Sequence, residues 1–325
     1  MLPDATEPLG EDAATAAFAA LLNGQVGEDD AFRFLDQMSR RDETALEIAV
    51  AARALRARMM PVAAPPGAID VCGTGGDGSH SLNVSTAVAI VVAACEVPVA
   101  KHGNRAASSR AGAADTLEAL GLDLARASER AEQSLAELGL AFLFAQRHHP
   151  ALAALAPVRK RLGRRTVFNL IGPLSNPARV RRQLIGIARP DYLPIVAQAL
   201  RLLGTEDFML VAGDEPLDEL SVAGPSSWVR ANGFTGRLIP AEAGLATHPQ
   251  GALRGGNAAY NADALDRLLR GEPGAYRDAV LLNAAAALMV AGHARDWQDG
   301  VEEAAEAIDK GLARALLSCW IQFCQ

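Results

Sequence analysis

The sequence predicts an α/β fold, in which a small N-terminal helical domain precedes a larger α/β domain with a mostly parallel central sheet flanked by helices. Short apolar runs lead through glycine-rich or basic turns into helical segments twice between residues 69 and 121, which is typical of parallel strands joined by helices. Residues 11 to about 60 instead repeat apolar side chains at helical spacings of three and four. The 325 residues exceed one average domain.

The N-terminal region predicts a helical domain over residues 1–66. Its apolar side chains share helical spacing and are Phe18, Leu21, Leu22, Phe32, Leu35, Met38, Leu46, Ile48, Ala49, Ala52 and Leu55. Pro61, Pro65, Pro66 and Gly67 end this region before the first strand. The α/β domain is then expected over residues 67–156 and 182–325.

The first strand is expected at Ile69–Cys72, and four glycines follow it between residues 73 and 78. Glycine allows positive φ and close approach of a ligand, so successive amides can turn toward an anion. Ser85 and Thr86 then fall at the start of an apolar helix, where free N–H groups and the helix dipole favour phosphate. This stretch therefore predicts an anion site.

A second strand is expected at Val97–Ala100, and it leads into a basic turn that begins at Lys101. Lys101, Arg105 and Arg110 give this turn a positive charge. In a parallel sheet both turns open at the same carboxyl edge, where ligands of α/β folds usually bind. The pair of turns predicts a site for a pyrophosphate or a phosphorylated sugar.

Glycine-rich turns are often only tight turns, and neither of the two best-known phosphate motifs is complete here. Residues 73–78 lack the lysine and hydroxyl that close a P-loop, and the second strand ends in Lys101 where a dinucleotide site needs an acid. The two turns together still favour phosphate binding.

Three linked motifs resemble the phosphoribosyl-diphosphate signatures of the anthranilate phosphoribosyltransferase family: Gly73-Thr74-Gly75-Gly76-Asp77, Asn83-Val84-Ser85-Thr86 and Lys101-His102-Gly103-Asn104-Arg105. The resemblance covers nearly the whole chain. It implies transfer of a phosphoribosyl group to anthranilate in tryptophan biosynthesis. The residues that it implies for phosphoribosyl diphosphate are Gly73, Gly76, Asp77, Ser81, Asn83, Val84, Ser85, Thr86, Lys101, His102, Gly103, Asn104, Arg105, Ala106, Ala107, Ser108, Ser109 and Ala113.

Arg159 and the loop Asn169–Pro177 that follows it resemble a further signature of the family. A planar guanidinium can hold a carboxylate through two parallel hydrogen bonds, so the resemblance assigns Arg159 to anthranilate. Anthranilate would also lie near Gly73 and Asn104, with His102, Gly172 and Pro173 lining its approach. The adjacent His148 and His149 have no acidic or thiol neighbour in sequence, which favours packing or hydrogen bonding over a metal.

An acidic turn follows a strand expected at Asp207–Ala212, and it places four carboxylates between residues 214 and 219. Such a turn is usually only solvated. Beside phosphate loops, adjacent carboxylates make good Mg²⁺ ligands, because Mg²⁺ prefers oxygen donors and shares its shell with substrate phosphates. The resemblance implies that Asp218 and Glu219 are the metal ligands, with Ser85 reaching the metal. It also implies about two Mg²⁺ ions per active site.

Composition excludes several classes of function. The net charge of −7 opposes a general nucleic-acid binder, although residues 138–190 hold ten Arg and Lys and no acid and are a candidate for facing an anionic ligand. The four cysteines lack CxxC spacing and indicate reduced thiols. No secretory signal is visible and the most apolar windows are too short to span a bilayer, so a cytoplasmic protein without membrane partners is expected.

Further helices are expected at Ala127–Leu138, Tyr192–Leu203, Asn261–Gly271, Asp278–Ala291 and Gly300–Gln322, and a strand at Gln183–Ile187. A β-rich excursion is expected at Trp228–Leu245. The family implies that residues 157–181 return to complete the helical domain, through which its members form homodimers. No Ser-His-Asp or Cys-His pattern is recognisable, as expected for a transfer that depends on positioning and electrostatics.

Two alternative functions are open from the sequence. A pyrimidine nucleoside phosphorylase shares the type of fold, but Lys101-His102-Gly103-Asn104 differs from the Lys-His-Ser signature expected of it. A nucleic-acid-binding paralogue without enzyme activity is favoured by the basic stretch and opposed by Arg159, Asp218 and Glu219.

Overall fold

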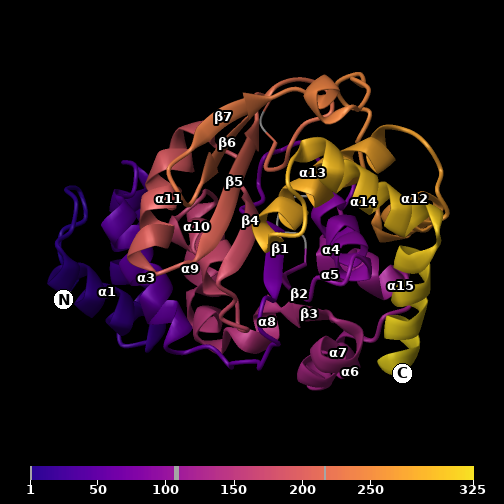
Figure 1. Ribbon diagram of the computed structural model, residues 1–325. Helices are drawn as coiled ribbons and strands as arrows, with labels where there is room; N and C mark the ends of the chain where they lie inside the picture. Colours follow the sequence, from indigo (N-terminus) through magenta and orange to yellow (C-terminus); the bar gives the residue numbers. More distant parts are fainter. Residues whose placement is uncertain (1, 106–109, 216) are drawn as a thin grey trace.

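The protein is built around one seven-stranded sheet with helices on both faces (Figure 1). The structure, a computed structural model, describes residues 2–105, 110–215 and 217–325. The strands lie in the order β3-β2-β1-β4-β5-β6-β7. Their bounds are β1 Ile69–Gly73, β2 Val99–Gly103, β3 Leu140–Phe144, β4 Arg182–Gly186, β5 Asp207–Gly213, β6 Ser226–Arg230 and β7 Thr235–Leu238. Because β1 to β5 pair in parallel and β6 and β7 antiparallel, the predicted mostly parallel sheet is confirmed.

The order of the strands creates a switch point between β1 and β4. The chain builds outward from β1 through β2 to β3, and it then returns to place β4 on the other side of β1. The loops that follow β1 and β4 therefore diverge, which is where open α/β sheets bind ligands.

Each face of the sheet has its own apolar core, because side chains alternate along a strand. On β5, Met209 and Val211 face one core, and Leu210 and Ala212 face the other. The first core contains the helices on the right of Figure 1. Their bounds are α4 Val84–Ala94, α5 Ala113–Ala119, α6 Leu124–Glu129, α12 Ala258–Leu269, α13 Ala275–Ala291, α14 Trp297–Asp309 and α15 Leu312–Phe323. A smaller core under β2 and β3 includes α7 Ala131–Leu138.

The N-terminal helices pack on the opposite face, to the left in Figure 1. These are α1 Glu11–Leu22, α2 Glu28–Ser39 and α3 Ala45–Arg56, and they contact α9 Ala156–Leu162, α10 Val167–Leu170 and α11 Leu193–Leu202. At the start of α3, Thr44 Oγ1 accepts a bond of 3.2 Å from the N–H of Glu47, a capping box that fixes this helix end. One continuous core joins these helices to the sheet, and the division into domains 1–66 with 157–181 and 67–156 with 182–325 stays a prediction.

Three predicted element boundaries are wrong. The second strand starts at Val99 rather than Val97 and ends at Gly103 rather than Ala100, because Val99–Gly103 pairs with Leu140–Phe144. The helix expected at Ala127–Leu138 is two helices that meet at Arg130, the last of them α7. The helix expected at Gly300–Gln322 breaks at Gly311, whose φ of +73° ends α14.

The other expected elements are present with ends shifted by a few residues, and α8 covers Ala145–His148. The excursion expected at Trp228–Leu245 contains β6 and β7. Among the described helices, none combines the length and the apolar character needed to cross a bilayer.

Candidate functional site

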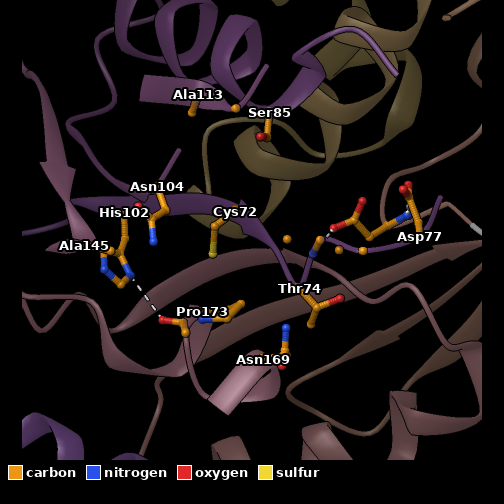
Figure 2. Close-up of a pocket in the computed structure, with 18 of the residues that line it drawn as sticks. Cys72, Thr74, Asp77, Ser85, His102, Asn104, Ala113, Ala145, Asn169 and Pro173 are labelled. Atoms are coloured by element: carbon orange, nitrogen blue, oxygen red, sulfur yellow. Dashed lines mark hydrogen bonds between the residues drawn. The ribbon is translucent and has the colours of Figure 1, made fainter. Parts of the chain in front are cut away.

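A cavity of about 900 Å³ opens at the carboxyl edge of the sheet, over the ends of β1, β2 and β4. Figure 2 shows its walls, with Ser85 and Ala113 on one side and Asn169 and Pro173 facing them across the opening. The predicted site residues that line it are Gly73, Gly76, Asp77, Ser81, Asn83, Val84, Ser85, Lys101, His102, Gly103, Asn104, Arg105, Ala113, Arg159, Gly172, Pro173, Asp218 and Glu219. The fold therefore brings both turns, the acidic segment and Arg159 to one place.

Five predicted site residues are not placed in this cavity. The side chain of Thr86 is buried, and its hydroxyl has no hydrogen-bond partner among the described residues. Any ligand contact of Thr86 would therefore come from its backbone. Ala106, Ala107, Ser108 and Ser109 lie outside the described residues.

The acidic segment after β5 crosses directly over the glycine-rich turn after β1. The N–H of Gly75 donates to Asp218 Oδ2 at 2.6 Å. A Cβ atom on Gly73 would lie 2.3 Å from Asp218 Oδ2, and one on Gly186 would lie 1.5 Å from the Asp218 backbone oxygen. Only glycine at the ends of β1 and β4 permits this crossing, so these positions fix where the Asp218 carboxylate lies.

Three carboxylates crowd together at this crossing. Burial and the nearby charge of Asp77 raise the pKa of Asp218 to about 7. Burial, followed by the charges of Asp218 and Asp77, raises the pKa of Glu219 well above its usual value. Glu219 Oε2 is buried without a hydrogen-bond partner among the described residues. A cation would relieve this excess of negative charge.

The chemistry of these donors suits Mg²⁺. Across the described ranges, no three His, Cys, Asp or Glu side chains form a preassembled metal site. Mg²⁺ is usually bound through one or two carboxylates and completes its shell with water and substrate phosphates, so an incomplete protein shell fits this metal. The hydroxyl of Ser85, which faces the same cavity, is a further oxygen donor.

Lys101 supplies a buried positive charge next to these acids. Its side chain reaches from β2 under the first turn, where Nζ donates to Val71 O at 2.7 Å and to Ser85 Oγ at 3.2 Å. Burial lowers its pKa, and the charge of Asp70 opposes that shift. Because Ser85 lies in the first turn of α4, the ammonium and the positive end of the helix act on the same part of the cavity.

His102 is a neutral, fixed imidazole at the other end of the cavity (Figure 2). Its Nδ1 lies 3.1 Å from the carbonyl oxygen of Gly172, which can only accept, so Nδ1 carries the proton. His102 Nε2 then accepts from Nε2 of His149 at 3.2 Å. Burial lowers the pKa of His102 to about 3, and the neighbouring His149 adds to this shift. His148 is also buried, with Nδ1 3.0 Å from Met60 O, and the expectation that both histidines pack and hydrogen-bond agrees with these contacts.

Arg159 is a half-buried cation with no ion pair or side-chain hydrogen bond among the described residues. It lies on α9 and lines the same cavity as the glycine-rich turn. Burial alone lowers its pKa. An unpaired guanidinium in a cavity wall is a site for an anion, and its fork geometry suits a carboxylate.

The second turn differs from the prediction in one respect. Although Arg105 lines the cavity, its guanidinium bonds Asp115 at 2.8 Å and Glu118 at 2.5 Å on α5, so its positive charge is paired with two acids. These acids of α5 lie within thirteen residues of Arg105, so the local sequence held the signal for this pairing. A phosphate contact of Arg105 would therefore use its backbone.

Asn83 connects the two turns through its side chain. Asn83 Oδ1 accepts from Thr116 Oγ1 at 2.6 Å and from Asn261 Nδ2 at 2.9 Å, and Asn83 Nδ2 donates to Ala111 O at 3.4 Å. The amide is thus held by α5, α12 and the second turn, and it supports the shape of the cavity.

Several residues of the cavity wall have no site role predicted from the sequence, among them Thr74, His149, Arg165 and Asn169, although Thr74 and Asn169 lie in the motifs quoted above. Arg165 was signalled only as part of the acid-free basic stretch. Other arginines of that stretch pair with acids elsewhere, such as Arg161 with Asp29 at 2.7 Å. Charge along the chain alone did not separate these two groups.

Comparisons with known proteins agree with this geometry. Residues 65–314 match the glycosyl transferase family, α/β domain. The anthranilate phosphoribosyltransferase of Novosphingobium aromaticivorans is 63% identical over 324 residues, which cover 99% of this chain and 98% of that relative. The anthranilate phosphoribosyltransferase of Thermus thermophilus superposes with a TM-score of 0.94 at 43% identity, covering 99% of both chains. The enzyme of Saccharomyces cerevisiae, in complex with phosphoribosyl diphosphate and Mg, superposes with a TM-score of 0.91 at 28% identity, covering 97% of this chain and 93% of the yeast chain.

Proposed function

Since this chain belongs to the anthranilate phosphoribosyltransferase family, we propose that its cavity binds anthranilate and phosphoribosyl diphosphate together, with magnesium on the diphosphate. The enzyme transfers the phosphoribosyl group of 5-phosphoribosyl 1-diphosphate to anthranilate. The products are N-(5-phosphoribosyl)anthranilate and pyrophosphate, and the step belongs to tryptophan biosynthesis.

The guanidinium of Arg159, unpaired within the described part of the chain, is the observation that carries the placement of anthranilate. It is half-buried in the wall of the cavity that also contains the glycine-rich turn. The carboxylate of anthranilate would complete it with two parallel hydrogen bonds. Gly73 and Asn104, together with His102, Gly172 and Pro173, border the same space, and the neutral His102 adds no charge beside the aromatic ring.

The diphosphate and the ribose 5-phosphate are assigned to the two turns at the carboxyl edge of the sheet. The first turn contains left-handed glycines, with φ of +66° at Gly75 and +70° at Gly76, which allow a backbone cradle for an anion. The first turn of α4 and the buried ammonium of Lys101 add positive potential.

Magnesium is assigned to Asp218, Glu219 and Ser85, with two ions per active site. The crowded carboxylates and Glu219 Oε2, which has no hydrogen-bond partner among the residues described, support a cation at this place, and the yeast relative holds Mg in its complex. When bound, Mg²⁺ neutralises the charge that develops on the departing pyrophosphate.

The proposed chemistry is a direct displacement at ribose C1. The bond from C1 to the amine nitrogen of anthranilate forms as the bond from C1 to the diphosphate oxygen breaks, and one proton passes from the amine to solvent. The residues of this chain align the two substrates and provide the electrostatic environment for an oxocarbenium-like ribose. No covalent nucleophile is required.

We also assign a homodimer associating through the helical domain, and a cytoplasmic location. Sedimentation at several protein concentrations tests the dimer, and a mass of one chain at every concentration would contradict it.

The transfer is tested by mixing the protein with anthranilate, phosphoribosyl diphosphate and Mg²⁺ and following the loss of anthranilate fluorescence. Fluorescence should fall only in the complete mixture, and a chelator should stop the reaction. Phosphate-dependent cleavage of thymidine, or salt-dependent oligonucleotide binding without transfer, would instead support the phosphorylase or the nucleic-acid-binding alternative.

A further inference from the structure

Arg165 contacts the glycine-rich turn from the segment that joins α9 to α10. It lies between α9 and α10, in the segment that packs on the N-terminal helices. Its Nη2 donates to the backbone oxygen of Gly75 and lies 3.4 Å from Thr74 Oγ1. A Cβ atom on Gly76 would lie 3.4 Å from Arg165 Nε, so the guanidinium rests against the turn itself.

Arg165 therefore adds a second hydrogen bond that fixes the backbone of Gly75 from its other side. The N–H of Gly75 donates to Asp218 Oδ2 at 2.6 Å, while its carbonyl accepts from Arg165. The preceding residue is held to β4, because Thr74 N–H donates to Gly186 O at 2.9 Å. The turn thus has separate attachments to β4, to the acidic segment and to the helical side of the cavity.

A turn of this composition needs such attachments to have one shape. Consecutive glycines lose more conformational entropy on ordering than other residues, so an unsupported Gly75-Gly76 pair would sample many conformations. A cradle whose amides are already oriented binds an anion more tightly than one that must be ordered on binding. In the part of the chain that the structure describes, Arg165 forms no ion pair that would hold it elsewhere.

We propose that Arg165 is a positioning residue, which holds the glycine-rich turn in its diphosphate-binding shape before the substrate arrives. It links the segment that carries Arg159 to the turn that binds the diphosphate, so the two substrate positions share one support. This inference rests on the proposed placement of the diphosphate on residues 73–78.

The test uses Arg165→Gln and Arg165→Lys in the full chain, with Arg164→Gln as the matched control. Arg164 is the adjacent arginine, but its guanidinium pairs with Asp36 on α2. Hydrogen exchange of residues 74–78 is measured without ligand, and binding of phosphoribosyl diphosphate with Mg²⁺ is measured by calorimetry without anthranilate. KM for each substrate follows from the fluorescence assay.

Arg165→Gln should speed exchange in the turn and weaken phosphoribosyl diphosphate binding roughly tenfold to hundredfold, the effect expected for a lost charged hydrogen bond. KM for anthranilate should change less than about twofold. Arg165→Lys should lie between, because lysine offers a single point donor in place of a fork. Arg164→Gln should match the unmodified protein in hydrogen exchange of the turn and in affinity for phosphoribosyl diphosphate.

Unchanged exchange and unchanged phosphoribosyl diphosphate affinity in Arg165→Gln would overturn the proposal. A rise in anthranilate KM alone would also overturn it, since Arg165 would then contact the acceptor. Faster exchange throughout the chain, in Arg165→Lys as well, would show a general structural role instead. If the unmodified protein failed to bind phosphoribosyl diphosphate, the proposed function would fail, whereas the exchange of the ligand-free turn would still report on Arg165.

Discussion

Replacing Arg159 by alanine should weaken anthranilate binding without weakening the fold. The guanidinium has no hydrogen bond or ion pair among the described residues, and burial lowers its pKa. Its removal leaves no buried partner unsatisfied, so the free energy of unfolding should change by less than about 1 kcal/mol. A structural arginine such as Arg41, which bonds the buried Glu47 at 2.6 Å, would behave in the opposite way.

The loss of affinity follows from the two charged hydrogen bonds to the carboxylate of anthranilate. Each hydrogen bond to a charged group contributes about 1.5–3 kcal/mol, so the loss of one alone would raise KM roughly tenfold to 150-fold, and the loss of both should raise it further. The assay is the decrease of anthranilate fluorescence at saturating phosphoribosyl diphosphate and Mg²⁺, with thermal unfolding measured on the same samples. Arg161→Ala is the control, because Arg161 lies on the same helix but pairs with Asp29 at 2.7 Å on the surface.

An Arg159→Ala variant with unchanged anthranilate KM would refute the assignment. A comparable rise in KM for phosphoribosyl diphosphate would place the guanidinium on the wrong substrate. A large fall in melting temperature would show that Arg159 has a structural partner, contrary to the geometry of the cavity wall.

Three further predictions concern the acidic crossing and the helical region. Gly186→Ala should abolish transfer and destabilise the fold by about 1–3 kcal/mol, because its Cβ would lie 1.5 Å from the backbone oxygen of Asp218. The transfer assay and urea unfolding measure these two effects, and near-normal activity would contradict the prediction. Asp218→Asn should raise the melting temperature at pH 8 without metal and lower the affinity for Mg²⁺, since burial and Asp77 oppose the charged form; a lower melting temperature would argue against this crowding. Glu43 accepts a hydrogen bond from the Tyr192 hydroxyl at 2.6 Å, and burial raises the pKa of Glu43 above 4.5, so its contribution to stability falls as pH rises above about 4.5. Glu43→Gln should therefore flatten the dependence of the melting temperature on pH between pH 4 and 8, and an unchanged slope would count against this prediction.

The arrangement of strands and helices was largely predictable, because alternation and helical spacing are local patterns. β1, β4 and β5 begin within one residue of their predicted starts. The errors arose where a local pattern had two interpretations. The apolar spacing continues across Gly311 because α14 and α15 both pack against α4, so periodicity alone did not reveal the break.

The gathering of these residues at one edge of the sheet was also predictable, but not the direction of each side chain. Glycine turns, a helix start and an acidic turn at strand ends pointed to one edge of a sheet, and the residues meet there. Arg105, Arg159 and Arg165 have the same side chain and lie in basic stretches. Their partners are acids of α5, an open cavity and a backbone carbonyl, respectively.

The amino-acid sequence alone determined the strand–turn–helix units and predicted an anion site at their turns, because glycine backbones and helix starts act over a few neighbouring residues. Only the tertiary structure decided that the Asp218 segment crosses Gly73 and Gly186, and that Arg165 reaches Gly75. Such contacts depend on the path of the whole chain, which brings Arg165 to Gly75 across 90 residues and Asp218 to Gly75 across 143 residues. The order of the strands in the sheet therefore determines the shape of the cavity, while the residue types that line it could be read from the sequence.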